Sequence, residues 1–134
     1  MTPLEVRTRI DVRWRDLDML GHLNQSVYHE LLEEGRAGLF HRIDALDAFV
    51  LARVELDYRA EVTRDYSPVE IVVRLARVGR SSVTVEHDVL RADGTVAAAG
   101  TSVLVAWDPA ERRSRPFGDE ERARLNAALG AAPA

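Results

Sequence analysis

Two carboxylates stand a few residues ahead of a predicted helix. Asp16 and Asp18 precede the segment Gly21-His22-Leu23-Asn24, and its Asn24 is a suitable N-cap for a helix over 25–42. A helix N-terminus presents unpaired N–H groups, which can hold a carbonyl oxygen as it gains negative charge during acyl transfer. A nearby carboxylate can attack that carbonyl or activate a water molecule. The spacing is therefore compatible with hydrolysis of an acyl compound.

Other interpretations of the same residue types are available. An aspartate before a helix is most often a cap or a loop carboxylate, so spacing alone favours a structural role. The Asp-x-Asp pattern of residues 16–18 also occurs in metal-dependent transferases, but no other metal ligands cluster nearby in the sequence. His29-Glu30 begins a pattern similar to zinc-binding His-Glu-x-x-His helices, but Glu33 replaces the second histidine. We expect a solvated helix face there.

Hydropathy patterns predict the elements that must position this segment. Apolar and charged residues alternate over 4–13, as in a half-buried strand, and apolar residues recur at helical spacing over 25–42. Further strands are predicted over 50–62, 69–78, 82–90 and 95–107, with a hairpin at Asp93-Gly94 and a short terminal helix over 120–129. Strands segregated from one long helix predict an α+β domain whose antiparallel sheet covers that helix.

Bulk properties narrow the class of protein. The 134 residues fit a single domain, 1–134, with a frayed tail over 130–134. The net charge of −4 argues against generic nucleic-acid binding. There is no cysteine, and hence no disulfide, thiol nucleophile or cysteine-bound metal. No signal peptide or membrane-spanning window is apparent, so we expect a cytoplasmic protein without membrane partners.

The segment from Val12 to Tyr28 resembles the 4-hydroxybenzoyl-CoA thioesterase-like family. The shared pattern is Asp-x-Asp-x-x-Gly-His-x-Asn followed by a tyrosine four residues later, and residues 54–59 and 103–108 resemble the family's second and closing strands. The resemblance implies a hotdog fold, an antiparallel five-stranded sheet wrapped around one long central helix. It also implies an acyl-CoA thioesterase that hydrolyses an acyl thioester to a free acid and a thiol.

The resemblance also assigns catalytic positions. Asp18 matches the family's catalytic carboxylate, which acts as nucleophile or as general base. Gln25 matches the position whose backbone N–H polarises the thioester carbonyl, and its replacement of the family's frequent asparagine leaves a backbone donor unaffected. His22 and Asn24 match motif positions near the reacting centre. No metal or separate cofactor is implied, since coenzyme A is part of the substrate.

Substrate contacts are implied less directly. Gly21 and Tyr28 lie within the motif. Arg80 and Ser81 lie in the turn after the third strand, which contacts coenzyme A phosphates in related enzymes, although Arg80 is equally well explained as a solvated hairpin arginine. After the second strand this chain has Arg64-Asp65, where the family commonly has a Gly-Asp pair. This difference can alter the loop or a nearby subunit contact.

Partners and alternatives follow from the same family. Its members pair protomers, which implies a homodimer or homotetramer with sites at the interface. A non-catalytic acyl-thioester binding protein and a thioesterase acting on acyl carrier protein remain alternative functions, because one fold supports many activities.

Overall fold

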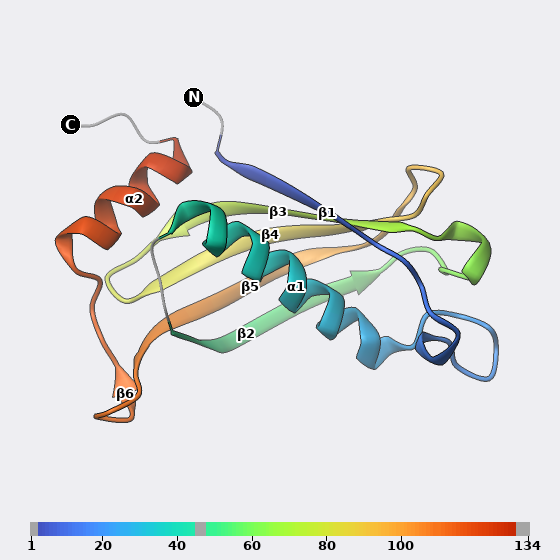
Figure 1. Ribbon diagram of the computed structural model, residues 1–134, viewed down its shortest axis with the longest axis horizontal. Helices are drawn as coiled ribbons and strands as arrows, with labels where there is room; N and C mark the ends of the chain where they lie inside the picture. Colours follow the sequence, from blue (N-terminus) through green and yellow to red (C-terminus); the bar gives the residue numbers. More distant parts are fainter. Residues whose placement is uncertain (1–2, 45–47, 131–134) are drawn as a thin grey trace.

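A computed structural model describes residues 3–44 and 48–130, and Figure 1 shows the path of the chain. Two short 3₁₀ turns, η1 (Trp14–Asp16) and η2 (Arg64–Tyr66), interrupt the loops. The helices and strands, in chain order, are β1 (Glu5–Ile10), α1 (Gln25–Ile43), β2 (Phe49–Tyr58), β3 (Val69–Val78), β4 (Ser82–Leu90), β5 (Val96–Asp108), β6 (Arg113–Ser114) and α2 (Asp119–Leu129).

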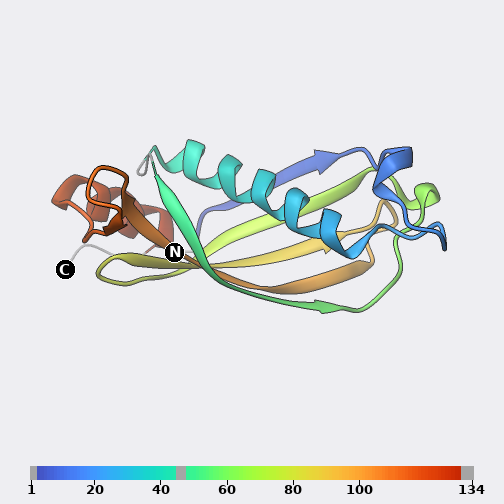
Figure 2. The ribbon, with the colours of Figure 1, turned by 90° about the horizontal axis from the view of Figure 1, so that it is seen from below.

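The strands form one antiparallel sheet in the order β1-β3-β4-β5-β2, and the two-residue β6 pairs with the end of β5. The sheet curls, and α1 lies across its concave face (Figure 2). The helix packs mainly against β1 and β3. β2 is the last strand in the sheet order and so forms a long sheet edge, with one row of backbone N–H and C=O groups unpaired among the described residues.

The α+β class and the antiparallel sheet expected from the sequence are confirmed, and so is the short terminal helix expected over 120–129, but the picture of a sheet around one long helix alone is incomplete. Beside α1, the described residues contain a second helix, α2, which closes one end of the sheet with the fully buried Leu125. The sheet also has a sixth, very short strand. The predicted fraying of 130–134 concerns residues outside the described part of the chain, except for Gly130, which ends α2.

Most element positions agree with the hydropathy patterns, but the strands predicted over 4–13 and 50–62 end earlier, at Ile10 and Tyr58. β3 and β4 begin and end at the predicted residues, and α1 differs from its prediction by one residue. The part of the chain that the structure describes contains no helix with the length and apolar composition needed to cross a bilayer.

Gly35 allows α1 to lie close against the sheet. A Cβ atom at this position would stand 2.6 Å from Cγ2 of Ile71 and 2.9 Å from Cγ2 of Val73 on β3. Both distances are shorter than normal carbon–carbon contacts. A Cβ at Gly38, one turn on, would meet its nearest atom, the Thr8 hydroxyl, at an ordinary 3.5 Å. Close packing therefore depends on the first glycine and not on the second.

A small polar cluster is enclosed in the otherwise apolar core. His87 on β4 is 1% exposed, and its Nε2 lies 2.8 Å from the hydroxyl of Ser102 on β5. Arg36 of α1 donates to the same hydroxyl from Nη1 at 3.2 Å. Burial, and then the charge of Arg36, lower the pKa of His87 to about 4. The ring is therefore neutral near pH 7.

We predict opposite effects for alanine at the two helix glycines. Gly35→Ala lowers the free energy of unfolding by about 1–3 kcal/mol, because the added methyl group forces α1 away from β3. Gly38→Ala raises it by up to about 1 kcal/mol, because alanine favours helix and has space. Urea denaturation of both variants measures the difference. A Gly35→Ala protein as stable as the wild type would contradict this packing.

We also predict that His87 contributes to acid sensitivity. Its folded pKa is about 4 against an ordinary value of 6.5, so between these values the unfolded chain binds more protons and stability falls as the pH falls. The loss from this group amounts to about 3 kcal/mol at most. Denaturation at several pH values should show a shallower acid slope for His87→Gln. The exposed His29→Gln serves as control and should keep the wild-type slope.

Candidate active site

The segment between β1 and α1 is a tight loop held by its own backbone. The N–H of Asp18 donates to the carbonyl of His22 at 2.8 Å, and the N–H of Gly21 donates back to the carbonyl of Asp18 at 3.1 Å. Gly21 has a φ of 76°, a left-handed conformation that glycine adopts without strain. The loop is tied to the rest of the fold by Leu23, whose N–H donates to the carbonyl of Val62 at 2.6 Å.

The two aspartates of the motif have different surroundings. Asp16 is 3% exposed, and its carboxylate accepts from the backbone N–H of Arg13 at 2.8 Å and from the Arg13 guanidinium at 2.9 Å. The Arg13 hydrogen bonds lower the pKa of Asp16. Both oxygens are therefore engaged in holding the loop.

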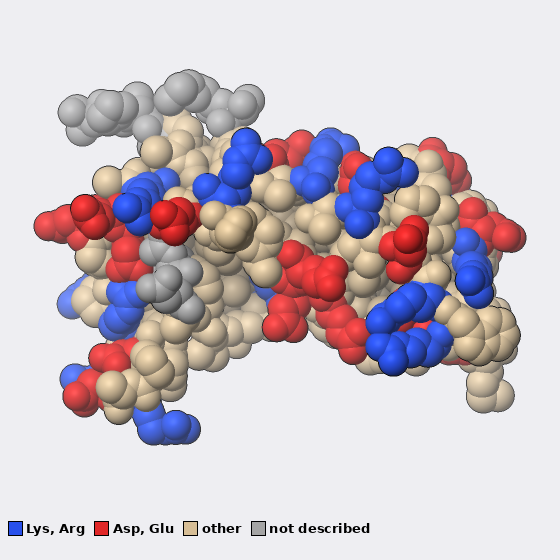
Figure 3. Space-filling view, in the orientation of Figure 1, with Lys and Arg blue, Asp and Glu red and all other residues tan. Residues whose placement is uncertain are grey.

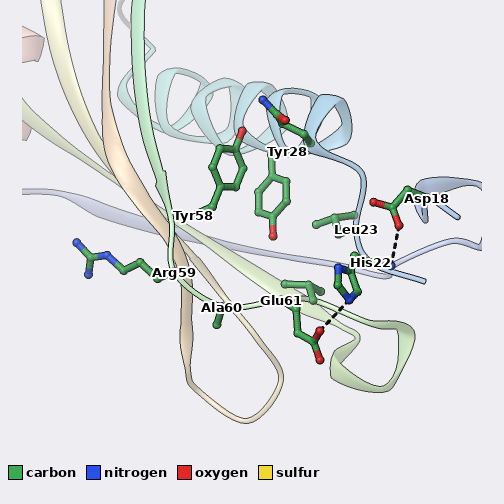
Figure 4. Close-up of a pocket in the computed structure, with 10 residues that line it drawn as sticks. Asp18, His22, Leu23, Tyr28, Tyr58, Arg59, Ala60 and Glu61 are labelled. Carbon is green, nitrogen blue, oxygen red and sulfur yellow. Dashed lines mark hydrogen bonds and ion pairs between the residues drawn. The ribbon is translucent and has the colours of Figure 1, made fainter. Parts of the chain in front are cut away.

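The Asp18 side chain is exposed, and only one of its two carboxylate oxygens accepts described hydrogen bonds. Its Oδ1 accepts from the backbone N–H groups of Leu20 at 2.9 Å and His22 at 3.1 Å. The other oxygen points toward Leu23 and the cavity (Figure 4). The backbone thus holds one oxygen in place and leaves the other free of described donors, as a nucleophile or general base requires.

The start of α1 supplies a hydrogen-bond donor beside this carboxylate. Asn24 is the N-cap, as predicted, and its Oδ1 accepts from the N–H of Ser26 at 3.1 Å. The N–H of Gln25 is the first of the helix, so it has no partner within the helix, and no described group outside the helix accepts from it. An oxyanion held there would also experience the positive end of the helix dipole.

These groups open into a cavity of about 400 Å³ whose far wall is the end of β2. Tyr28 and Tyr58 meet edge to face across it, with ring centroids 5.0 Å apart (Figure 4). Burial raises the pKa of Tyr28, so its phenol stays protonated. The imidazole Nε2 of His22 lies 2.8 Å from Oε2 of Glu61 and closes the lower side.

The cavity residues were only partly predicted from the sequence. Among the predicted residues, those that line the cavity are Asp18, His22, Gln25 and Tyr28. Asn24 caps the helix and Gly21 shapes the loop. Tyr58 and Glu61 were missed, because they follow the motif by some 30 residues and only β2 brings them back. A charged residue just beyond a strand's end was the available signal.

Arg80 and Ser81 lie elsewhere in the chain. They form the β3–β4 turn, and the backbone carbonyl of Arg80 accepts from the N–H of Phe117 and from the guanidinium of Arg122 on α2. This turn and the loop between β1 and α1 lie at opposite ends of the sheet (Figure 1). Arg80 and Ser81 therefore do not line the cavity beside Asp18 in this chain, and their predicted contact with coenzyme A stays a prediction.

No metal site is evident near the loop. Within residues 3–44 and 48–130, no three His, Asp or Glu side chains gather as a metal ion would require. The prediction that the chemistry needs no metal stays a prediction.

Comparison with known proteins agrees with this geometry. The thioesterase-like superfamily model matches residues 12–125. A thioesterase from Thermus thermophilus, solved in complex with coenzyme A and Zn, is 39% identical, with a TM-score of 0.83 over 95% of this chain and 96% of its own. A predicted thioesterase from Bacillus stearothermophilus is 27% identical, with a TM-score of 0.84 over 93% of this chain and 96% of its own. The uncharacterized protein YsmA of Bacillus subtilis (strain 168) is 26% identical over 122 residues, which are 87% of this chain and 82% of YsmA.

Fold and site together define a thioester hydrolase with a hotdog-type sheet. The chain belongs to the thioesterase-like superfamily, as the motif around Asp18 predicted.

Proposed function

We propose that this protein is an acyl-CoA thioesterase with Asp18 as its catalytic carboxylate. The observation that carries the proposal is the half-engaged Asp18 beside the unpaired N–H of Gln25, both on one cavity. The similar Thermus thermophilus thioesterase was solved with coenzyme A, which supports coenzyme A as the carrier. Coenzyme A enters only as part of the substrate, and no separate cofactor takes part.

The chemistry divides between these two groups. The Gln25 N–H donates to the thioester carbonyl oxygen, which becomes an oxyanion when a nucleophile adds to the carbonyl carbon. As general base, Asp18 takes a proton from the attacking water; as nucleophile, it forms a mixed anhydride that water then cleaves. On either route the C–S bond breaks, the thiolate leaves and is protonated, and the acid keeps the oxygen from water or carboxylate.

His22 and Glu61 act on the same cavity from its lower side. Their 2.8 Å contact fixes the imidazole, and the backbone N–H of His22 holds Asp18. His22 therefore positions the carboxylate, and Glu61 positions His22. Gly21, Asn24 and Tyr28 shape the loop, the helix start and the acyl side of the cavity.

We further propose that two copies pair through β2. This strand is an edge with ten residues, and Val50, Leu51 and Tyr58 are 40–46% exposed on it. An unpaired, partly apolar edge of this length favours pairing with a second strand. Antiparallel pairing would turn the partner's β3–β4 turn, with its Arg80 and Ser81, toward the catalytic loop, where these residues can meet coenzyme A phosphates.

A thioesterase acting on acyl carrier protein would use the same cavity. A non-catalytic acyl-thioester binding protein would need neither the free oxygen of Asp18 nor the unpaired N–H of Gln25. Those two features favour the enzyme.

We predict that the two aspartates separate activity from stability. Asp18→Asn keeps the loop's hydrogen bonds through its amide oxygen but lowers kcat by about 10²–10⁴-fold, since the base or nucleophile is lost. Asp16→Asn keeps kcat and lowers the free energy of unfolding by about 1–3 kcal/mol, because the Arg13 pair is weakened. Thiol release from several acyl-CoA esters and urea denaturation measure the two quantities.

Wild-type turnover by both Asp18→Asn and Asp18→Ala would remove Asp18 from the mechanism. Acyl-CoA binding without thiol release from any ester would favour the binding protein. Faster turnover of an acyl group on acyl carrier protein than of the same group on coenzyme A would identify acyl carrier protein as the natural carrier.

We predict a dimer or tetramer in solution. A protomer of 15.0 kDa should give a light-scattering mass of at least twice that value at micromolar concentration. A charge at Val50, as in Val50→Lys, should lower the mass toward the monomer, whereas a charge at the exposed Ala123 of α2 should not. A monomeric wild type would contradict pairing through β2.

A further inference from the structure

A second cavity lies between α1 and β2, toward the C-terminal end of the helix. Its volume is about 570 Å³, and α1, β2 and β5 form its walls. The apolar lining is Phe40, Phe49, Leu51 and Leu104. Arg36 also lines it and is only 7% exposed. A nearly buried cation is thus part of a wall that combines apolar side chains with the exposed polar side chains of Glu33, His41 and Asp44.

The guanidinium of Arg36 has hydrogen-bonding capacity to spare. It carries five N–H donors, and its one described bond runs from Nη1 to the Ser102 hydroxyl at 3.2 Å. No described carboxylate forms an ion pair with it. Of the described side-chain nitrogen and oxygen atoms, His87 Nδ1 alone is fully enclosed without a partner. The other Arg36 donors are therefore not fully enclosed, and Arg36 lines the cavity.

The protein does not neutralise this charge from within. A buried charge without a partner is costly, and burial lowers the pKa of Arg36. His87 is neutral near pH 7 and offers no negative charge. Glu33, whose charge raises the pKa of Arg36, also lines the cavity, but it is exposed to solvent and forms no described ion pair with Arg36. A carboxylate inside the cavity would pair with the planar guanidinium through two hydrogen bonds.

Apolar side chains of β2 lie between this cavity and the one beside Asp18. Gln25 and Arg36 are eleven residues apart on α1, which places them about 16 Å apart along the helix axis. Tyr58 lines the first cavity and Leu51 lines the second. Val54 and Leu56 lie between them on β2, and strand alternation puts both on the side of Tyr58. An acyl chain whose thioester lies at Gln25 can follow these side chains toward Arg36.

Acidic side chains near the opening of the second cavity affect how an anion can reach Arg36. Glu33 and Asp44 stand at its outer edge, and acidic side chains gather over the middle of α1 (Figure 3). A free anion from solvent must pass these carboxylates and is repelled. A carboxylate at the end of an apolar chain is tethered beside Arg36 by the rest of the acyl group, so its pairing with Arg36 must exceed the repulsion from these two carboxylates.

We propose that Arg36 is a specificity-determining residue that binds a carboxylate at the far end of the acyl group. The preferred substrates are then coenzyme A thioesters of dicarboxylic acids, with the thioester at Gln25 and the free carboxylate at Arg36. This proposal rests on the proposed thioesterase activity and names its substrate class.

The test compares matched pairs of esters. Succinyl-, adipyl-, suberyl- and sebacyl-CoA are assayed by thiol release beside butyryl-, hexanoyl-, octanoyl- and decanoyl-CoA. We expect kcat/KM of at least one dicarboxylic ester to exceed that of its neutral partner by about 10–100-fold, the usual effect of a hydrogen bond between charged groups. Arg36→Met should abolish that ratio and leave kcat/KM for the neutral ester nearly unchanged.

Two further variants sharpen the comparison. Arg36→Lys keeps the charge and should retain part of the ratio of kcat/KM for the dicarboxylic ester to kcat/KM for its neutral partner. Arg42→Gln removes an exposed charge from the same helix and should keep the wild-type ratio. Circular dichroism checks folding, and if Arg36→Met does not fold, the wild-type ratio and Arg36→Lys still decide.

Several outcomes would overturn the proposal. One is equal kcat/KM within every pair for the wild type. Another is an equal loss toward both members of a pair in Arg36→Met, which would make Arg36 purely structural, or an interface residue if the light-scattering mass also falls. If the wild type releases no thiol at all, the thioesterase proposal fails. Calorimetry with octanedioate and octanoate on wild type and Arg36→Met then decides the Arg36 site by itself.

Discussion

The close contact of α1 with β3 at Gly35 determines where everything else lies. With hydrogen as its side chain, the helix rests on Ile71 and Val73 at a distance that a methyl group would prevent. Because α1 is drawn toward β1 and β3, the space between the helix and β2 stays open, and both large cavities lie there. The same placement directs the helix N-terminus at one end of that space and Arg36 at the other.

The loop between β1 and α1 shows how two identical side chains acquire different surroundings. Asp16 gives both oxygens to Arg13 and is buried, so it can only hold the loop. Asp18 receives two backbone donors on one oxygen and presents the other to the cavity. Spacing cannot distinguish these cases, since both residues precede the same helix. The distinction depends on the turn around Gly21, which brings the backbone N–H groups of Leu20 and His22 to Asp18 and not to Asp16.

Much of the fold could be predicted because its signals are local. Alternation gave β3 and β4 to the residue, and Asn24 was recognised as a cap from its place before the helix. The sequence predicted α2 as a short terminal helix but not its packing role. That role depends on Leu125, which is fully buried where α2 closes one end of the sheet. Glu61, Tyr58 and the Arg36–Ser102–His87 cluster could not be predicted, since strand pairing alone brings them together.

The buried cluster shows why chain-distant contacts matter for specificity. Arg36 reads from the sequence as one charge among many on an acidic helix, and Ser102 as an ordinary strand residue. Only the register of β4 with β5, which sets His87 opposite Gly100 and near Ser102, encloses the guanidinium and leaves its outer donors toward the cavity. An apolar wall at that point would be cheaper to bury than a cation. Retaining the cation is reasonable where a ligand supplies the opposite charge, and this is the physical basis of the proposal that Arg36 binds the distal carboxylate of an acyl group.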